Sequence, residues 1–199
     1  MTVAIVQSPF ANLASVENAV RRLGWQTLTT RDAGALRSAS RVILPGVGAA
    51  GPAMRALAEM DLIDTIKSLT QPVLGICLGM QLLFSSTTES GGVATLGIID
   101  GEVTALPALL QPLPHMGWNQ LSEIIDHPLT QNVAAGEFVY FIHSYAAPVG
   151  ADALATCVYN GQAFSAMVAK GNFAGCQFHP ERSSKVGQAI IQNFLSWKP

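Results

Sequence analysis

Apolar and polar positions follow two different periods along the first 90 residues. Apolar residues recur at helical spacing over 13–23 and again over 51–69, and a short helix is expected from 78 to about 85. Asn12 is placed to cap the first of these helices, which Gly24 would end. Strands that are apolar throughout and alternate with helices indicate a parallel sheet covered on both faces. Three such continuous apolar runs occupy residues 2–6, 41–46 and 72–77.

The second half of the chain is richer in strand patterns. Asn160-Gly161 separates two of them and predicts a two-residue hairpin turn. A last helix is expected over about 184–197. The pattern therefore predicts one domain over residues 1–199: a doubly wound α/β fold, mostly parallel, with helices on both faces and an antiparallel β addition. The expected strands of the second half lie within 96–106, 138–146, 153–159 and 164–170.

Composition narrows the function classes. The 199 residues are 49% hydrophobic and 12% charged, with a net charge of −2, which argues against disorder and against a nucleic-acid surface. No apolar run approaches the ~20 residues of a membrane span, and the N-terminus opens directly on a strand rather than a signal peptide. Three cysteines without C-x-x-C spacing fit a reducing cytoplasm.

A cysteine flanked by glycines follows the strand at 72–77. The segment Gly75-Ile76-Cys77-Leu78-Gly79 fits a nucleophile on a sharp strand-to-helix turn, where only glycine allows the backbone to approach closely. A helix N-terminus there favours the thiolate, and the Leu78 N–H could donate to an oxyanion. The same segment also fits a buried core cysteine beside turn glycines, so this motif alone leaves both interpretations open.

The segment "CQFHPER" (176–182) supplies a histidine and a carboxylate. His179 ends an apolar strand, and Glu181 lies two residues on, so both side chains would point the same way in an extended segment. With Cys77 they provide a nucleophile, a base and an acidic group that orients the base. A lone histidine would be an ordinary core or surface residue; the combination favours catalysis.

Another glycine-rich turn, "LPGVG" (44–48), closes a second parallel strand. Gly46 and Gly48 would let the N–H groups around Val47 turn toward a developing negative charge. Without Cys77, an ordinary turn before the next helix would be the better interpretation.

"GICLGMQ" followed by "FHPE" resembles the triad class (class I) of glutamine amidotransferases. Within that class, "LPGVG", "LPHMGWN" (113–119), "FVYFIHSYA" and Asn12 resemble the glutaminase subunits of imidazole glycerol phosphate synthase, along essentially the whole chain. The resemblance implies a flavodoxin-like fold and a thioester mechanism that uses Cys77 as nucleophile, His179 as acid and base, and Glu181 to orient it.

The resemblance also implies further roles. Val47 and Leu78 would donate to the oxyanion, and Glu89 would bind the α-ammonium group of glutamine, although it could instead be a solvated loop residue. Arg182 departs from the lysine often found after "HPE", and the two cations are not equivalent. The other glutamine-binding residues would be Gly46, Gly48, Gln81, His143, Ser144 and Tyr145, and the interface residues would be Asn12, Trp118 and Arg182.

A partner is expected, since this chain has no room for a synthase domain. The resemblance implies that this partner is a (β/α)8-barrel cyclase subunit in a heterodimer. The cyclase would use the ammonia to make imidazole glycerol phosphate and an aminoimidazole carboxamide ribotide in histidine biosynthesis. No cofactor, metal, nucleic acid or membrane is expected. A zinc site built from Cys77, His143 and His179 is poorly supported, because no close ligand pair occurs.

Several alternatives stay open. The chain could serve another synthase, such as that of anthranilate or GMP, although "LPHMGWN" argues against this. It could be a non-catalytic regulatory or scaffold subunit, or a stand-alone thiol hydrolase. His115 could contact the partner or be structural, and Trp118 could simply pack against the sheet. Cys157 and Cys176 are expected to be core thiols, and His127 a surface turn residue.

Overall fold

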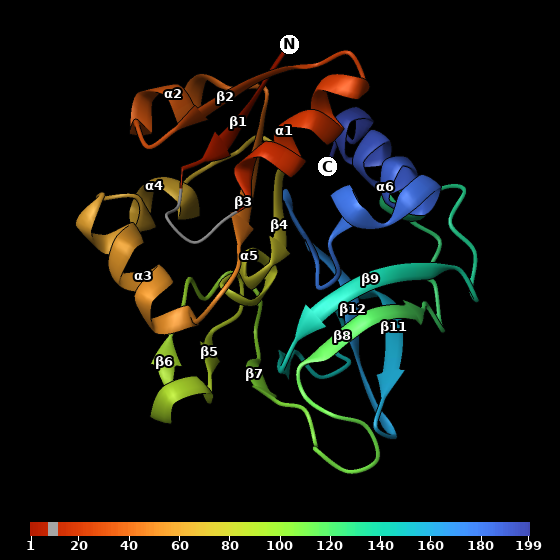
Figure 1. Ribbon diagram of the computed structural model, residues 1–199. Helices are drawn as coiled ribbons and strands as arrows, with labels where there is room; N and C mark the ends of the chain where they lie inside the picture. The colour runs from red at the N-terminus through yellow and green to blue at the C-terminus, as the bar shows by residue number, and fades with distance from the viewer. Residues whose placement is uncertain (8–11) are drawn as a thin grey trace.

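The central sheet of the computed structural model has seven strands in the order β11-β12-β13-β4-β3-β1-β2 (Figure 1). The structure describes residues 1–7 and 12–199. The five strands from β13 to β2 are parallel, and β12 and β11 extend the sheet in antiparallel fashion. The strands are β1 (Thr2–Val6), β2 (Gln26–Thr30), β3 (Arg41–Gly46), β4 (Val73–Cys77), β11 (Ala153–Tyr159), β12 (Gln162–Lys170) and β13 (Phe173–Cys176).

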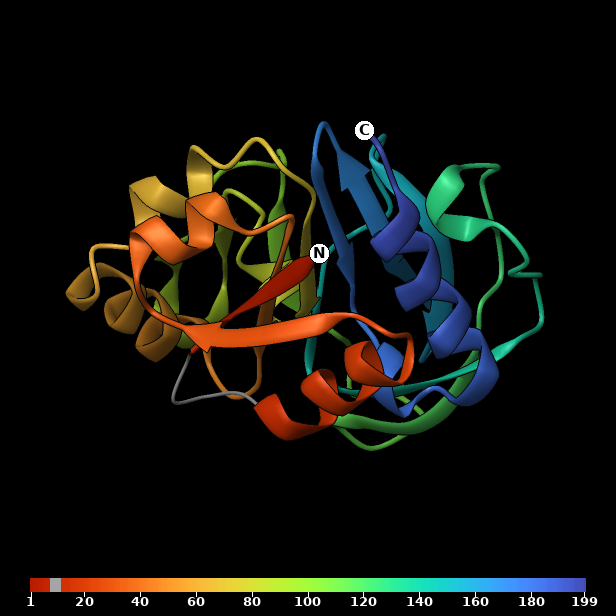
Figure 2. The same cartoon turned by 90° about the horizontal axis from the view of Figure 1, so that it is seen from above.

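Helices cover both faces of this sheet, as the view from above shows (Figure 2). Successive residues of β1 enter different cores: Val3 and Ile5 pack with α1 and α6, whereas Ala4 and Val6 pack with the helices opposite. This alternation, with both faces buried, is what a parallel doubly wound sheet requires, and the predicted fold class is confirmed. The helices are α1 (Leu13–Arg22), α2 (Ala33–Ser38), α3 (Ala50–Glu59), α4 (Ile63–Lys67), α5 (Leu78–Gln81) and α6 (Ser184–Ser196).

Two smaller sheets lie beside the carboxyl ends of β3 and β4 (Figure 1). One has four strands in the order β10-β7-β5-β6, and the other is the antiparallel pair β8–β9, in which His115 lies opposite His143. Their strands are β5 (Ser86–Thr87), β6 (Val93–Ala94), β7 (Glu102–Ala105), β8 (His115–Gln120), β9 (Phe138–His143) and β10 (Tyr145–Ala146).

Some predicted elements have different limits. The helix expected over 51–69 is broken into α3 and α4, because Asp61 adopts a φ of 53° between them. The helix expected to reach residue 85 ends at Gln81. The strand expected over 138–146 is interrupted at Ser144. The predicted hairpin turn is confirmed: Asn160 and Gly161 both have positive φ, 52° and 77°, between β11 and β12.

Among the described residues, none of the helices combines the length and apolar character that a membrane span needs.

Candidate active site

Cys77 lies at the turn from β4 into α5 with a φ of 54° and a ψ of −110°, a conformation that L residues rarely adopt. The flanking glycines explain how the turn packs. A Cβ on Gly75 would lie 2.6 Å from the Gly79 oxygen, and a Cβ on Gly79 would lie 1.8 Å from the Leu44 oxygen. The backbones of β3, β4 and α5 therefore meet at distances that only glycine permits.

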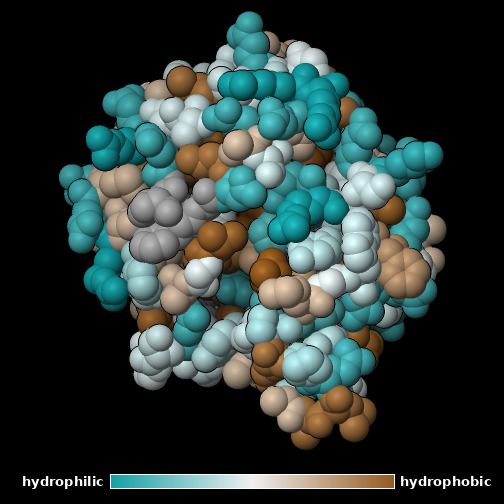
Figure 3. Space-filling view, in the orientation of Figure 1, coloured by the Kyte–Doolittle hydropathy of each residue, from teal (hydrophilic) through white to brown (hydrophobic). Residues whose placement is uncertain are grey.

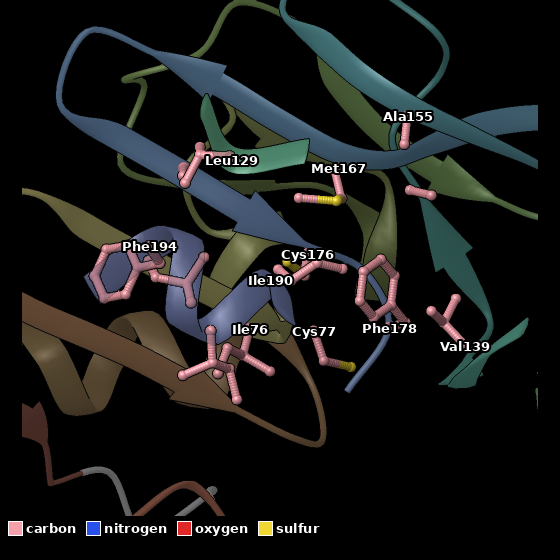
Figure 4. Close-up of a cluster of buried hydrophobic side chains, with 14 of the residues drawn as sticks. Ile76, Cys77, Leu129, Val139, Ala155, Met167, Cys176, Phe178, Ile190 and Phe194 are labelled. Atoms are coloured by element: carbon pink, nitrogen blue, oxygen red, sulfur yellow. The ribbon is translucent and has the colours of Figure 1, made fainter. Parts of the chain in front are cut away.

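Cys77 lies at the edge of the core that α6 covers, with its sulfur directed away from Ile76 (Figure 4). It also lines a cavity of about 290 Å³. Figure 3 shows the surface hollowed near the centre of this face, between the ends of β3 and β4 and the β8–β9 pair. The residues lining the cavity are Val47, Gly48, Cys77, Leu78, Gln81, Glu89, Pro114, Ile142, His143, Ser144 and Tyr145.

The predicted oxyanion donors lie on two sides of the thiol. Leu78 is the first residue of α5, so its N–H has no acceptor within the helix. Val47 follows β3 and is 37% exposed, and Gly48 adopts a φ of 91°, which suits glycine. Gly46, predicted near the substrate, does not line the cavity; a Cβ there would lie 2.9 Å from that of Leu78, so this glycine allows β3 and α5 to pack.

His179 and Glu181 form a buried pair. His179 Nδ1 lies 2.8 Å from Glu181 Oε1, and their side chains are 6% and 2% exposed. The pairing expected from the i, i+2 spacing is present, but not in an extended segment: Pro180–Arg182 is a 3-10 turn. Because Glu181 accepts at Nδ1, the Nε2 atom is left to face the thiol side.

The electrostatics of His179 depend on Cys77. Burial alone would lower the pKa of the imidazolium, but the nearby Cys77 sulfur and the Glu181 carboxylate outweigh burial and raise it to about 10. His179 Nε2 is buried and has no hydrogen-bond partner among the described residues. Catalytic hydrogen bonds are often long before substrate binds, so the lack of a close contact at Nε2 is compatible with proton exchange between His179 and Cys77.

Two residues fix the turn that carries the pair. Ser183 Oγ donates to the His179 oxygen at 2.7 Å and accepts from the Tyr140 N–H at 3.0 Å, tying the turn to β9. A Cβ on Gly187 would lie 1.9 Å from the Pro180 oxygen, so glycine lets the first turns of α6 press against the 3-10 turn.

Two of the predicted substrate-binding residues, Gln81 and Glu89, already make side-chain hydrogen bonds within the protein. Gln81 Nε2 donates to the backbone carbonyl oxygen of Tyr145 at 2.8 Å and to Gln177 Oε1 at 3.1 Å. Glu89 Oε2 accepts from the Ala50 N–H at 2.6 Å, at the start of α3. Both residues line the cavity, and each side chain has hydrogen-bonding capacity left for a ligand.

His143 and His115 form a second buried pair. His143 Nδ1 lies 2.9 Å from the backbone carbonyl oxygen of Tyr145, which can only accept a hydrogen bond, so Nδ1 carries the proton of the neutral ring. His143 Nε2 therefore accepts from the N–H of His115 Nδ1, 3.0 Å away. Asn119 Nδ2 lies 3.3 Å from His115 Nε2 and completes the chain. Burial lowers the pKa of His143 to about 3 and that of His115 to about 4, so both rings are neutral at pH 7.

Of the predicted interface residues, Trp118 and Arg182 both contact Tyr140, whereas Asn12 lies at the start of α1. Trp118 is 52% exposed on β8 and packs edge-on against Tyr140, whose other neighbour is the Arg182 guanidinium, 4.4 Å from the ring centroid. Asn12 instead caps α1, accepting from the Ser15 N–H at 3.4 Å. The tip of the loop between β7 and β8 is also apolar and exposed (Figure 3).

Sequence reasoning missed Gln177, Ser183, Pro114 and Ile142. Gln177 is completely buried and donates to Cys77 Sγ at 3.9 Å. Its position directly after a strand cysteine was visible, but a single amide in an apolar run has no spacing that marks it.

Cys77, Cys157 and Cys176 are free thiols, and burial raises the pKa of Cys157 to about 12. Over residues 1–7 and 12–199, no group of three or more histidine, cysteine or acidic side chains is arranged to hold a metal ion.

Known proteins of similar sequence identify the family of this chain. The model of the class-I glutamine amidotransferase family matches residues 5–197. The imidazole glycerol phosphate synthase subunit HisH of Shewanella loihica is 50% identical, over 96% of this chain and 88% of the relative. That of Pectobacterium atrosepticum is 49% identical, over 98% and 99% of the two chains.

A solved structure, that of PurLQS from Thermotoga maritima, superposes with a TM-score of 0.72 at 20% identity, covering 98% of this chain and 97% of that one, and shows the same fold. A buried cysteine elbow beside a histidine–glutamate pair, on this fold and with these relatives, leads to one family. The chain belongs to the class-I glutamine amidotransferases and, among them, to the HisH subunits of imidazole glycerol phosphate synthase.

Proposed function

We propose that this chain is the glutaminase subunit of imidazole glycerol phosphate synthase, hydrolysing glutamine to glutamate and passing ammonia to a cyclase subunit. One observation carries the proposal: the Cys77 elbow lines a cavity of about 290 Å³ at the carboxyl ends of β3 and β4, with the His179–Glu181 pair beside the thiol. In open α/β sheets, this edge is where ligands bind.

In the proposed reaction, His179 takes the thiol proton and Cys77 Sγ attacks the side-chain carbonyl carbon of glutamine. The N–H groups of Leu78 and Val47 stabilise the oxyanion. His179 then gives its proton to the departing nitrogen, and ammonia leaves as a γ-glutamyl thioester forms. Water, losing a proton to His179, attacks the thioester, and that proton returns to the sulfur as glutamate is released.

Substrate orientation follows from the polar groups of the cavity. The Glu89 carboxylate is the natural partner of the substrate α-ammonium group. Gln81, His143, Ser144 and Tyr145 line the same cavity and would surround the rest of the molecule. Because His143 and its partner His115 are both neutral, His143 adds no positive charge that would compete with His179 for the thiolate.

The proposed partner is a (β/α)8-barrel cyclase in a heterodimer. Its docking surface would include the outward face of β8–β9, where the Tyr140 ring meets Trp118 edge-on and lies under the Arg182 guanidinium, near Ile142, which lines the cavity. Aromatic and arginine side chains dominate binding energy at such surfaces. The free, buried cysteines suit a reducing compartment such as the cytoplasm.

The test compares two nitrogen sources in the complex with a cyclase subunit. With glutamine, Cys77→Ala should reduce formation of imidazole glycerol phosphate by at least ~10⁴-fold, because no other group can form the thioester. With ammonium salts, Cys77→Ala should match the parent, since the cyclase site is untouched. Cys157→Ala is the matched control and should keep both activities. Glutamine-dependent turnover near the parent rate in Cys77→Ala would overturn the proposal.

A further inference from the structure

Gln177 is a buried amide that the proposed mechanism does not use. It follows β13, its side chain is completely buried, and its backbone N–H donates to the Ala166 oxygen at 2.9 Å. An amide removed from water costs free energy unless it finds hydrogen-bond partners. The partners of this amide are therefore informative.

The orientation of the Gln177 amide is fixed by its neighbour Gln81. The backbone carbonyl oxygen of Tyr145 can only accept a hydrogen bond, so the Gln81 atom 2.8 Å away is the NH₂ nitrogen. The same nitrogen lies 3.1 Å from Gln177 Oε1. The NH₂ group of Gln177 then faces Cys77 Sγ, at 3.9 Å. Gln177 thus presents a donor, not an acceptor, to the sulfur.

Besides His179, whose pKa the sulfur raises, Cys77 Sγ has another polar neighbour, opposite in character to Gln177. In its neutral form Cys77 donates to the Ile142 oxygen at 3.7 Å. A thiolate has no proton to donate, and a carbonyl oxygen then repels it. The Gln177 N–H acts the other way, because a hydrogen bond to the charged form of a group favours that form. Ionisation therefore shifts the favourable contact of the sulfur from Ile142 to Gln177.

We propose that Gln177 is a positioning residue that donates to the Cys77 thiolate and, held by Gln81, fixes the sulfur on the elbow for attack. The inference rests on the proposed glutaminase function. Gln177 does not line the cavity, so it acts through Cys77 and not on glutamine. Its loss should lower kcat and leave KM for glutamine within about twofold.

The test measures the rate of iodoacetamide alkylation of Cys77 against pH in the isolated chain, with peptide mass analysis to identify the thiol. Gln177→Met removes the donor, and Gln177→Glu keeps the shape and the bond from Gln81 while placing an acceptor near the sulfur. Both should move the midpoint of the alkylation profile to higher pH, by roughly one unit or more for Gln177→Glu. Both should lower kcat by about tenfold or more.

Ser165→Ala is the matched control. It also removes a buried side-chain hydrogen bond, from Ser165 Oγ to the Pro148 oxygen at 2.8 Å, and should move neither the midpoint nor kcat. Thermal unfolding checks that each variant is folded. A folded Gln177→Met and Gln177→Glu pair with the parent alkylation profile would overturn the role of Gln177. Parent protein that kept hydrolysing glutamine after complete Cys77 alkylation would instead overturn the proposed function.

Discussion

At the scale of single residues, the site depends on how His179 is held. Glu181 fixes the ring by accepting at Nδ1, and Ser183 and Gly187 fix the turn on which both residues lie. The orientation of the His179 ring is therefore set by contacts on its Nδ1 side, and only Nε2 remains for proton transfer. Loss of the orienting carboxylate should then be less harmful than loss of the ring itself.

We expect His179→Ala to lower kcat for glutamine hydrolysis by at least ~10⁴-fold and Glu181→Gln by a smaller factor, since an orienting residue costs less than the base. Steady-state kinetics of the complex with the cyclase subunit measures both. Gln188→Ala, an exposed residue on α6, the helix that follows the turn, serves as the control and should keep parent activity. A larger loss in Glu181→Gln than in His179→Ala would contradict these roles.

Which residues could be predicted depended on how local their pattern is. Cys77, His179 and Glu181 stand out because glycines, proline and short spacing mark them within a few positions. Gln177 and Ile142 carry no such mark, since their importance comes from contacts across the fold. Gly46 was expected near the substrate from the resemblance, and the structure places it at the close contact between β3 and α5.

At the scale of elements, the β8–β9 pair joins the cavity to the surface. Its register places His115 opposite His143, a residue 28 positions away in sequence. The chain from Asn119 through His115 and His143 ends at the Tyr145 oxygen, which also accepts from Gln81. The outward side chains of the same strands include Trp118 and Tyr140. The β8–β9 pair therefore contributes side chains both to the cavity and to the exposed surface.

This buried histidine pair should make the fold acid-sensitive. Burial lowers the pKa of both rings, to about 4 and about 3, against about 6.5 in the unfolded chain. The stabilisation is complete above pH ~6.5 and is lost as pH falls toward 4, because only the unfolded state takes up these protons. His179, with its raised pKa, acts oppositely: its contribution is complete below pH ~6.5 and is lost as pH rises toward 10.

We expect the free energy of unfolding to fall by several kcal/mol between pH 7 and pH 4.5, at ~1.4 kcal/mol per pH unit for each ring. Urea unfolding measures it. His115→Phe, which can stack on Phe141 and Tyr159 as the imidazole does, should be less stable at pH 7 but should lose less on acidification. An equally steep acid loss in that variant would show that other groups are responsible.

Elements with a strong period were predictable, and short or polar ones were not. β2 and α2 were missed because each is only five or six residues long, and β2 has no fully buried position. The break at Asp61 was invisible because apolar spacing continues across it. The pairing of β8 with β9 could not be predicted, since register across a long loop depends on tertiary packing.

At the scale of the whole molecule, the cavity is only part of a synthase. Ammonia released into water would be largely protonated, so we propose that hydrolysis is coupled to a docked cyclase. The Val47–Gly48 turn is exposed and glycine-containing, which suits an oxyanion donor that is aligned only in the complex.

We expect the isolated chain to hydrolyse glutamine at least ~10²-fold more slowly than the complex with cyclase and its nucleotide ligand, the cost of one missing oxyanion donor. Trp118→Ala should weaken cyclase binding by at least 1 kcal/mol. Val158→Ala, an exposed apolar residue on β11, is the control and should bind normally. Calorimetric titration and steady-state glutaminase assays measure the two effects. Equal hydrolysis with and without cyclase would contradict the coupling.

The backbone angles of Cys77 have a consequence for the stability of the enzyme as well as for its chemistry. A non-glycine residue held at a φ of 54° and a ψ of −110° stores strain that the rest of the fold must offset. Activity and folding then make opposite demands on one position. Two inactive variants separate them: Cys77→Ala keeps the strained conformation, and Cys77→Gly relieves it. By chemical denaturation, Cys77→Gly should be the more stable by about 1–2 kcal/mol, although glycine usually destabilises a folded chain relative to alanine. The usual order, with alanine the more stable, would mean that the elbow is not strained. If glycine is the more stable, then natural selection has kept the thiol nucleophile at position 77 although it lowers the free energy of unfolding of the protein.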